Sequence, residues 1–206
     1  MAPAAPLPQP MLARSGPIPT RGEWTFEVKW DGFRAIVSTE GAPLRVRSRR
    51  GWNMTPLLPE LSALPVTGTF DGELVAFGED RTPDFPLLCE RMLMRRPNIA
   101  VTYVAFDVLS IEGEAVTRAP YSERRVQLEA LNLNGLHWQT PETFDDGDAL
   151  FAAVCAHELE GVVAKRPNGR YLPGERAWVK IKNREYWRYE MERESAINKR
   201  RPRMFV

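Results

Sequence analysis

The chain has 206 residues, of which 43% are hydrophobic and 27% charged, with a formal net charge of +1. This length suits one domain with a sizeable core. The near-neutral charge argues against a uniformly basic nucleic-acid wrapper but leaves a local basic groove open. The two distant cysteines predict neither a disulfide framework nor a zinc site, and the two isolated histidines are expected to be structural. With no apolar run long enough for a bilayer and no apolar leader, the chain is expected to be cytoplasmic, with no membrane partner.

The first 20 residues carry six prolines and predict an extended, partly mobile arm. A strand-rich body is expected from 21 to 184, where β-branched and alternating segments are frequent. Asp31-Gly32 lies between two such segments and predicts a hairpin. The predicted strands are 24–30, 33–38, 44–49, 68–77, 101–110, 160–167 and 177–183.

Helices are expected to be fewer. Ser122 is a candidate N-cap for a helix reaching Asn132, and the acidic cluster at 145–148 is expected to start another that runs to about Glu158. Strands and helices that alternate without a regular βαβ rhythm favour an α+β fold with largely antiparallel sheets. The remaining predicted helices are 56–64, 84–95 and an amphipathic one at 185–197.

Residues 185–206 form a basic tail, and its last stretch, "NKRRPR", has no acids. One interpretation is a solvated helix with a disordered end, and the other is a contact with the DNA backbone. In the second case deleting residues 198–206 is expected to flatten the salt dependence of DNA binding and slow sealing.

Lysine is used sparingly, at five positions, although the chain holds 28 lysines and arginines together. A lysine can lose its proton and act as a nucleophile, which an arginine does not. Lys29 lies between Glu27 and Asp31, just before the predicted turn at Asp31-Gly32. Lys180 and Lys182 alternate in a predicted strand, so both lie on one face, which is either solvated or binds an anion.

Six ordered motifs carry a resemblance to a known family. They are "KWDGFR" at 29–34, "SRRG" at 48–51, "FDGEL" at 70–74, "YVAFDVL" at 103–109, "EGVVAK" at 160–165 and "WVKIK" at 178–182. Together they resemble the nucleotidyltransferase (adenylation) domain of ATP-dependent DNA ligases, in particular the bacterial end-joining type. The similarity runs from about Met11 to Asn183. It implies two largely antiparallel β-sheets flanked by helices, with a nucleotide cleft between them, as in the ATP-grasp-like fold of ligases.

The resemblance also implies a chemistry that uses ATP and Mg²⁺ (or Mn²⁺). Lys29 would attack the α-phosphorus of ATP to form a lysyl-AMP, which passes AMP to the 5′-phosphate of nicked double-stranded DNA before the 3′-OH seals it. Glu160 and Asp31 would serve a divalent metal or the strand terminus. The lysines that would neutralise the α-phosphate are Lys165, Lys180 and Lys182.

Further residues would recognise the nucleotide and the nick. By the same resemblance Glu27 would recognise the adenine edge and Phe106 would stack on the base, since every purine offers a π-face. Arg34 and Glu73 would bind the ribose hydroxyls or the nearby phosphate. Arg49 would bind the 5′-phosphate of the nick.

The sequence departs from the family's pattern after the last motif. A complete ligase of this family continues into an oligonucleotide-binding barrel, whereas about twenty residues follow Asn183 here. Self-adenylation is therefore expected to be weak or to need a partner protein that supplies the barrel. Two alternatives remain open beside a ligase in DNA repair or end joining. One is an RNA ligase or capping-type nucleotidyltransferase, and the other is a nick-binding protein without catalysis.

Overall fold

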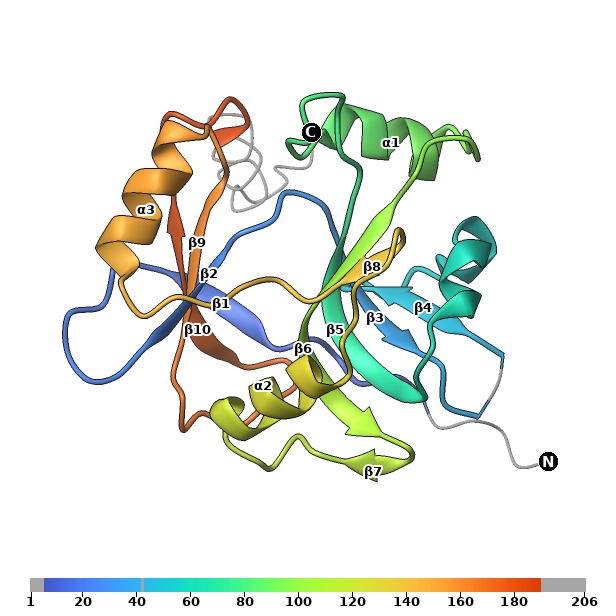
Figure 1. Cartoon of the computed structure of the whole chain (residues 1–206), viewed down its shortest axis with the longest axis horizontal. Helices are drawn as coiled ribbons and strands as arrows, with labels where there is room; N and C mark the ends of the chain where they lie inside the picture. The colour runs from blue at the N-terminus through green and yellow to red at the C-terminus, as the bar shows by residue number, and fades with distance from the viewer. Residues whose placement is uncertain (1–5, 42, 190–206) are drawn as a thin grey trace, which may run out of the picture.

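The computed structural model describes residues 6–41 and 43–189 as two β-sheets that face each other (Figure 1). Sheet A has the strand order β1-β10-β9-β2, and sheet B the order β4-β3-β5-β6-β7, with β8 paired to β6. None of the helices in the described part of the chain is long and apolar enough to cross a membrane. The strands of sheet A are β1 (Leu12–Ser15), β2 (Thr25–Val28), β9 (Gly161–Lys165) and β10 (Arg176–Lys182). Those of sheet B are β3 (Phe33–Ser38), β4 (Arg45–Ser48), β5 (Gly68–Val75), β6 (Thr102–Ile111), β7 (Glu114–Ala115) and β8 (Trp138–Gln139).

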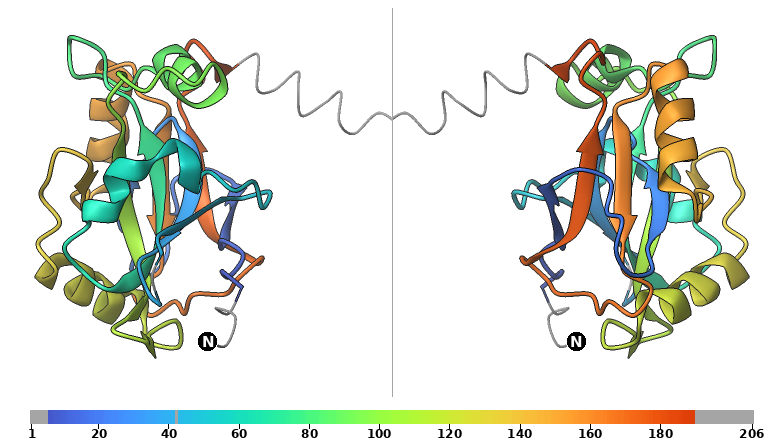
Figure 2. Two further views of the ribbon diagram at one scale, coloured as in Figure 1. Left: turned by 90° about the vertical axis from the view of Figure 1, so that its right-hand side faces the viewer. Right: turned by 90° about the vertical axis from the view of Figure 1, so that its left-hand side faces the viewer.

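Sheet A separates an apolar face from a charged one. Phe26, Val162 and Val179 belong to a buried cluster under helix α3 (Gly147–Ala156), which lies against β9 in both views (Figures 1 and 2). Side chains alternate along a strand. The residues between these apolar positions, such as Glu27 and Lys165, therefore point toward sheet B.

Sheet B carries the larger core. Its outer face packs against α1 (Phe85–Leu93), α2 (Tyr121–Ala130) and two short 3₁₀ helices, η1 (Thr55–Leu57) and η2 (Pro59–Ala63). A smaller apolar cluster joins the two sheets, and strands β1, β3, β6 and β10 all contribute to it or border it. Its buried members are Met11, Ile36, Phe106, Leu109, Tyr171 and Trp178.

The predicted α+β fold with largely antiparallel sheets is confirmed, with two parallel pairs, β1–β10 and β6–β8. The predicted hairpin at Asp31-Gly32 is wrong. Strand β2 pairs with β9 in sheet A, whereas β3 pairs with β4 and β5 in sheet B, so Asp31-Gly32 crosses between sheets. Gly32 is required because a Cβ there would lie 2.1 Å from the carbonyl oxygen of Leu74.

Part of the segment predicted as an extended, partly mobile arm belongs to sheet A. Strand β1 pairs in parallel with β10, and the Met11 side chain is buried in the cluster between the sheets. The Met11 amide donates a hydrogen bond to the Tyr171 hydroxyl, 2.8 Å away. Residues 12–15 therefore form one edge of sheet A.

Two predicted helices are found with the expected caps or limits. Helix α1 begins after Asp84, whose carboxylate accepts a hydrogen bond from the Leu87 amide at 2.8 Å. Helix α3 begins after Asp146, inside the predicted acidic cluster. Cys89 in α1 and Cys155 in α3 are free thiols, as the absence of a disulfide framework predicted.

Two helix predictions need correction. The segment 56–64 forms two 3₁₀ turns rather than an α-helix, because Pro59 has no amide hydrogen to continue the first turn. Ser122 does not cap α2, which begins after Pro120. The Ser122 amide instead donates to the carbonyl of Pro167, 2.8 Å away.

The predicted helix at 185–197 does not begin at Glu185, because residues 184–188 form bends and turns. Residues 190–206 lie outside the described residues. The basic stretch at 198–206 and its predicted contact with DNA therefore fall outside them as well.

Candidate active site

Lys29 lies directly after strand β2, where sheet A meets the crossing to sheet B. Its amide donates to the carbonyl of Gly161 at 2.8 Å, and its ammonium contacts the Glu160 carboxylate. The side chain of Lys29 is 23% exposed, whereas that of Glu160 is buried. Gly161 permits this arrangement, since a Cβ there would lie 2.1 Å from the Ile181 carbonyl.

Glu160 joins the two lysine-bearing strands. One carboxylate oxygen contacts Lys29, and the other, Oε1, is 3.6 Å from Nζ of Lys182. Oε1 is buried and, within the described part of the chain, accepts no hydrogen bond. A pocket of about 180 Å³ opens beside this group, and Lys29, Asp31 and Glu160 all line it.

Glu73 approaches the same lysine from sheet B. In the register of β3 and β5 it lies opposite Arg34. Burial raises the pKa of Glu73 to about 8, and the positive charges of Lys29 and Arg34 oppose this rise. A carboxyl group with this pKa is largely protonated at neutral pH and can donate a hydrogen bond.

A second lysine–glutamate pair lies deeper between the sheets. Nζ of Lys165 is 2.7 Å from the Glu27 carboxylate and 2.9 Å from the carbonyl oxygen of Phe106. The Tyr121 hydroxyl also donates to Glu27. Burial lowers the pKa of Lys165, an effect that Glu27 opposes. Its ammonium lies 4.6 Å from the ring centroids of both Phe106 and Trp178.

Arg34 belongs to a buried network rather than to open solvent. Its Nε and Nη2 bind the two oxygens of Asp71 at 2.5 and 2.6 Å, and Nη2 also donates to the carbonyl of Met11 at 3.0 Å. The Tyr171 hydroxyl donates to the same Asp71 at 2.5 Å. The guanidinium carbon is 4.5 Å from the centroid of the Phe106 ring. The ring is therefore held by charged neighbours on two strands.

Phe106 lies at a bulge in β6. Asp71 pairs with Asp107 and Gly72 with Ala105, which leaves Phe106 as an extra residue in its strand. Ala105 belongs to the outer core of sheet B, whereas Phe106 belongs to the cluster between the sheets. There Phe106 meets Trp178 of sheet A edge-on, with ring centroids 5.9 Å apart.

The structure brings most of the predicted site residues together, but in two groups. Lys29, Asp31 and Glu160 share the pocket, with Lys182 and Glu73 next to them. Lys165 lies at the other end of β9, about 13 Å along the strand from Gly161. There it contacts Glu27 and the carbonyl of Phe106 instead of the Lys29 group.

Three further residues predicted to bind phosphate lie on β10 and in the loop that follows β4. Lys180 and Lys182 lie on one face of β10, as predicted, because their register partners are Val163 and Gly161. Arg49 is exposed in the loop that follows β4. Ser48 shapes this loop by accepting hydrogen bonds from the amides of residues 50 and 52.

Several residues of the site were missed by sequence reasoning. Asp71 and Trp178 lie inside quoted motifs, and Asp71 could have been found because it is two residues from Glu73 on the same strand face. The others lie in segments without a motif and had no local signal. They are Tyr121, Tyr171, Tyr186 and Arg188.

The donor set for a metal is small. The described residues contain no group of three or more His, Cys, Asp or Glu side chains that could hold an ion. Both oxygens of Asp31 are engaged, by Tyr186 and Arg188. The buried Oε1 of Glu160 is the better candidate, because Mg²⁺ is commonly held by one or two carboxylates together with substrate phosphates.

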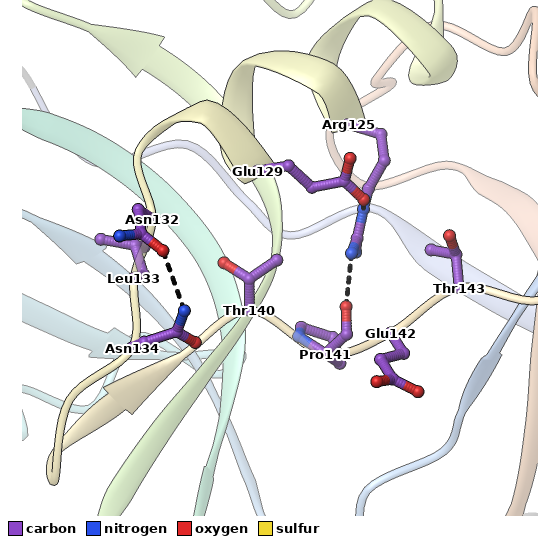
Figure 3. Close-up of a pocket in the computed structure, with 9 residues that line it drawn as sticks. All are labelled: Arg125, Glu129, Asn132, Leu133, Asn134, Thr140, Pro141, Glu142 and Thr143. Carbon is purple, nitrogen blue, oxygen red and sulfur yellow. Dashed lines mark hydrogen bonds and ion pairs between the residues drawn. The ribbon is translucent and has the colours of Figure 1, made fainter.

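A larger pocket of about 370 Å³ lies elsewhere, between the end of α2 and residues 132–143 (Figure 3). Its wall includes Arg125, which donates to the carbonyl of Pro141. It contains none of the residues predicted from the motifs, so size alone does not identify the site.

Comparison with known proteins agrees with this geometry. The sequence family described as ATP dependent DNA ligase domain matches residues 10–182. The chain belongs to this family. The multifunctional non-homologous end joining DNA repair protein LigD of Mycobacterium tuberculosis is 37% identical over 184 residues, which cover 84% of this chain but 24% of that protein. The SPbeta prophage-derived DNA ligase-like protein LigB of Bacillus subtilis is 31% identical, over 86% of this chain and 68% of its own length.

Solved structures show the same fold. The ligase domain of M. tuberculosis LigD superposes with a TM-score of 0.74 at 36% identity, covering 85% of this chain and 59% of that one. A mycobacterial DNA ligase D complexed with ATP and MES gives the same TM-score and identity, over 85% and 60%. The chain thus spans less than two thirds of these structures and about a quarter of the LigD proteins.

Proposed function

We propose that this protein is an ATP-dependent DNA ligase that uses Lys29 as its nucleophile. The amine of Lys29 would form a P–N bond to the α-phosphorus of ATP, and pyrophosphate would leave. AMP would then pass to the 5′-phosphate of a nick, and the 3′-OH would displace it to close the strand. The observation that carries this proposal is the partly exposed Lys29, held by Glu160 at a pocket that residues of two of the six motifs line.

The surroundings of Lys29 support this role. A lysine attacks only after losing its proton, and Glu160 contacts the ammonium group that must lose it. Lys180 and Lys182 would neutralise the phosphates. Mg²⁺, held through Glu160, would supply further charge neutralisation for the transferring phosphate.

The deeper group would bind the nucleoside. We assign Phe106 to stacking on adenine and Glu27 to its polar edge, with Arg34 and Glu73 toward the ribose. Lys165 is assigned to the base as well, rather than to the α-phosphate, because it contacts Glu27 and the carbonyl of Phe106.

The proposed polymer is nicked double-stranded DNA in end joining, with Arg49 on the 5′-phosphate. The names of the LigD relatives, which describe non-homologous end joining, support this choice. The proposal includes a partner protein that supplies a barrel domain. The alternative substrate is nicked RNA instead of DNA.

The test is incubation with α-labelled ATP and Mg²⁺, followed by denaturing electrophoresis. We expect label on the wild-type chain and none on Lys29→Ala. A nicked DNA duplex that already carries the 5′-AMP then tests sealing without ATP, with a nicked RNA duplex and GTP in parallel. Failure of both labelling and sealing, with and without an added barrel domain, would leave a nick-binding protein as the function.

A further inference from the structure

The chain turns back onto the active site immediately after β10. Asn183 is buried and controls this turn: its amide donates to the Glu160 carbonyl at 3.0 Å, and its side-chain nitrogen to the Leu159 carbonyl at 3.1 Å. Its side-chain oxygen accepts from the Glu185 amide at 3.0 Å. Because Asn183 is tied to the Glu160 backbone, the residues that follow it are held beside the pocket of Lys29.

Two of those residues bind Asp31. The Tyr186 hydroxyl donates to Oδ2 of Asp31 at 2.6 Å, and the Arg188 guanidinium contacts Oδ1. Asp31 is 5% exposed and the Arg188 side chain 13%. Arg188 also stacks on Phe85 at the start of α1, with its guanidinium carbon 3.3 Å from the ring centroid. Both oxygens of Asp31 are thus engaged, and its charge is neutralised.

The neutralised carboxylate lies in the wall of the pocket that Lys29 also lines. Asp31, Tyr186 and Trp187 all line this pocket. Its other buried carboxylate, Glu160, is already paired with Lys29. Asp80 and Glu158 also line it, but both are solvent-exposed, where water and salt screen their charge.

We propose that Tyr186 and Arg188 are positioning residues that hold Asp31 and cancel its charge, so that a nucleoside triphosphate can enter the Lys29 pocket. The proposal rests on the proposed function for the identity of the ligand. A triphosphate is strongly anionic, and a buried carboxylate without a partner would repel it at short range, where screening is weakest. Neither residue touches the reacting atoms: each would act through Asp31.

The first test separates binding from chemistry in the full chain. Arg188→Gln should raise the KM for ATP in lysyl-AMP formation about tenfold, with a smaller change in kcat. Tyr186→Phe removes one hydrogen bond but no charge, so its effect should be smaller. Glu185→Gln is the matched control, since this exposed neighbour does not contact Asp31 through its side chain, and its KM should equal that of the wild type.

The decisive variant is the double substitution Asp31→Asn with Arg188→Gln. An amide has no charge to neutralise, so the double variant should recover most of the ATP affinity that Arg188→Gln loses. A purely structural role for Arg188 predicts no such recovery. An unchanged KM in Arg188→Gln, or a double variant no better than the single one, would overturn the proposal.

A second measurement does not depend on catalysis. Thermal unfolding of Asp31→Asn, Arg188→Gln and the double variant reports the coupling between Asp31 and Arg188. The double variant should unfold at a higher temperature than Arg188→Gln, because it removes the unpaired buried charge. If the effects of the two single substitutions on the unfolding temperature simply add in the double variant, the pairing of Asp31 with Arg188 would be overturned. If the variants show this coupling but the wild-type chain takes up no label from ATP, the pairing holds and the proposed function is contradicted.

Discussion

Sheet A presents two lysine–glutamate pairs on one face, and their difference explains how the site is divided. The Lys165 side chain is 1% exposed and its partner Glu27 3%, whereas Lys29 is 23% exposed. Lys165 is further fixed by the carbonyl of Phe106, and Glu27 by Tyr121. The same two residue types therefore make a buried pair at one end of β9 and a more accessible pair at the other. Exposure, rather than residue type, distinguishes Lys29, the proposed nucleophile.

The largest effect is expected from changing Lys29 in the more accessible pair. Lys29→Arg should abolish lysyl-AMP formation, because a guanidinium stays protonated and cannot attack phosphorus. The label on the chain after denaturing electrophoresis measures this, and a thermal unfolding curve close to that of the wild type controls for folding. Stable labelling of Lys29→Arg would mean that another residue is the nucleophile.

Breaking the buried Lys165–Glu27 pair should lower the free energy of unfolding. Glu27→Ala leaves Lys165 buried without its carboxylate partner, and loss of one member of a buried pair typically lowers the free energy of unfolding by about 3–5 kcal/mol. Urea unfolding measures the change. Glu160→Ala is the comparison, and its loss should be smaller because the more exposed Lys29 can be hydrated. Equal losses in the two variants would contradict the distinction between the pairs.

The base-binding role of the deeper group gives a smaller effect. Phe106→Ala should weaken ATP binding by about 1–3 kcal/mol, the range for loss of a stacking platform. Glu160→Ala should leave nucleotide binding largely intact while removing metal-dependent turnover. Titration calorimetry with ATP, together with the labelling assay, separates the two. If both variants lost binding equally, the division into a base end and a chemical end would be wrong.

The smallest effect concerns pH. Burial raises the pKa of Glu73 in the folded chain from 4.5 to about 8. Between these values the unfolded chain loses the proton that the folded chain keeps, so the free energy of unfolding should fall as pH rises. Because Glu73 is only partly buried, the fall should be about 1–2 kcal/mol. Urea unfolding at pH 5 and pH 8 measures it, and Glu73→Gln, which does not ionise, should reduce this fall.

The local sequence was sufficient for the fold class and for seven of the strand segments, but not for β1, β7 or β8. Lys29, Glu160 and Lys182 lie in motifs of a few residues each. Alternation along β10 correctly placed Lys180 and Lys182 on one face, because that periodicity is a local property of an extended strand. The bulge at Phe106 was not foreseen, since it exists only in the pairing with β5.

Only the tertiary structure decided how these segments pair across long sequence distances. Asp31-Gly32 has the composition of a hairpin turn, yet the strands on either side find better partners in different sheets. Lys165 meets Glu27 across 138 positions, and Arg188 meets Asp31 across 157. Such contacts depend on which surfaces the core brings together, and no local propensity contains that information. The sequence thus indicated which side chains are candidates for the chemistry, and packing determined which of them are buried, accessible or neutralised.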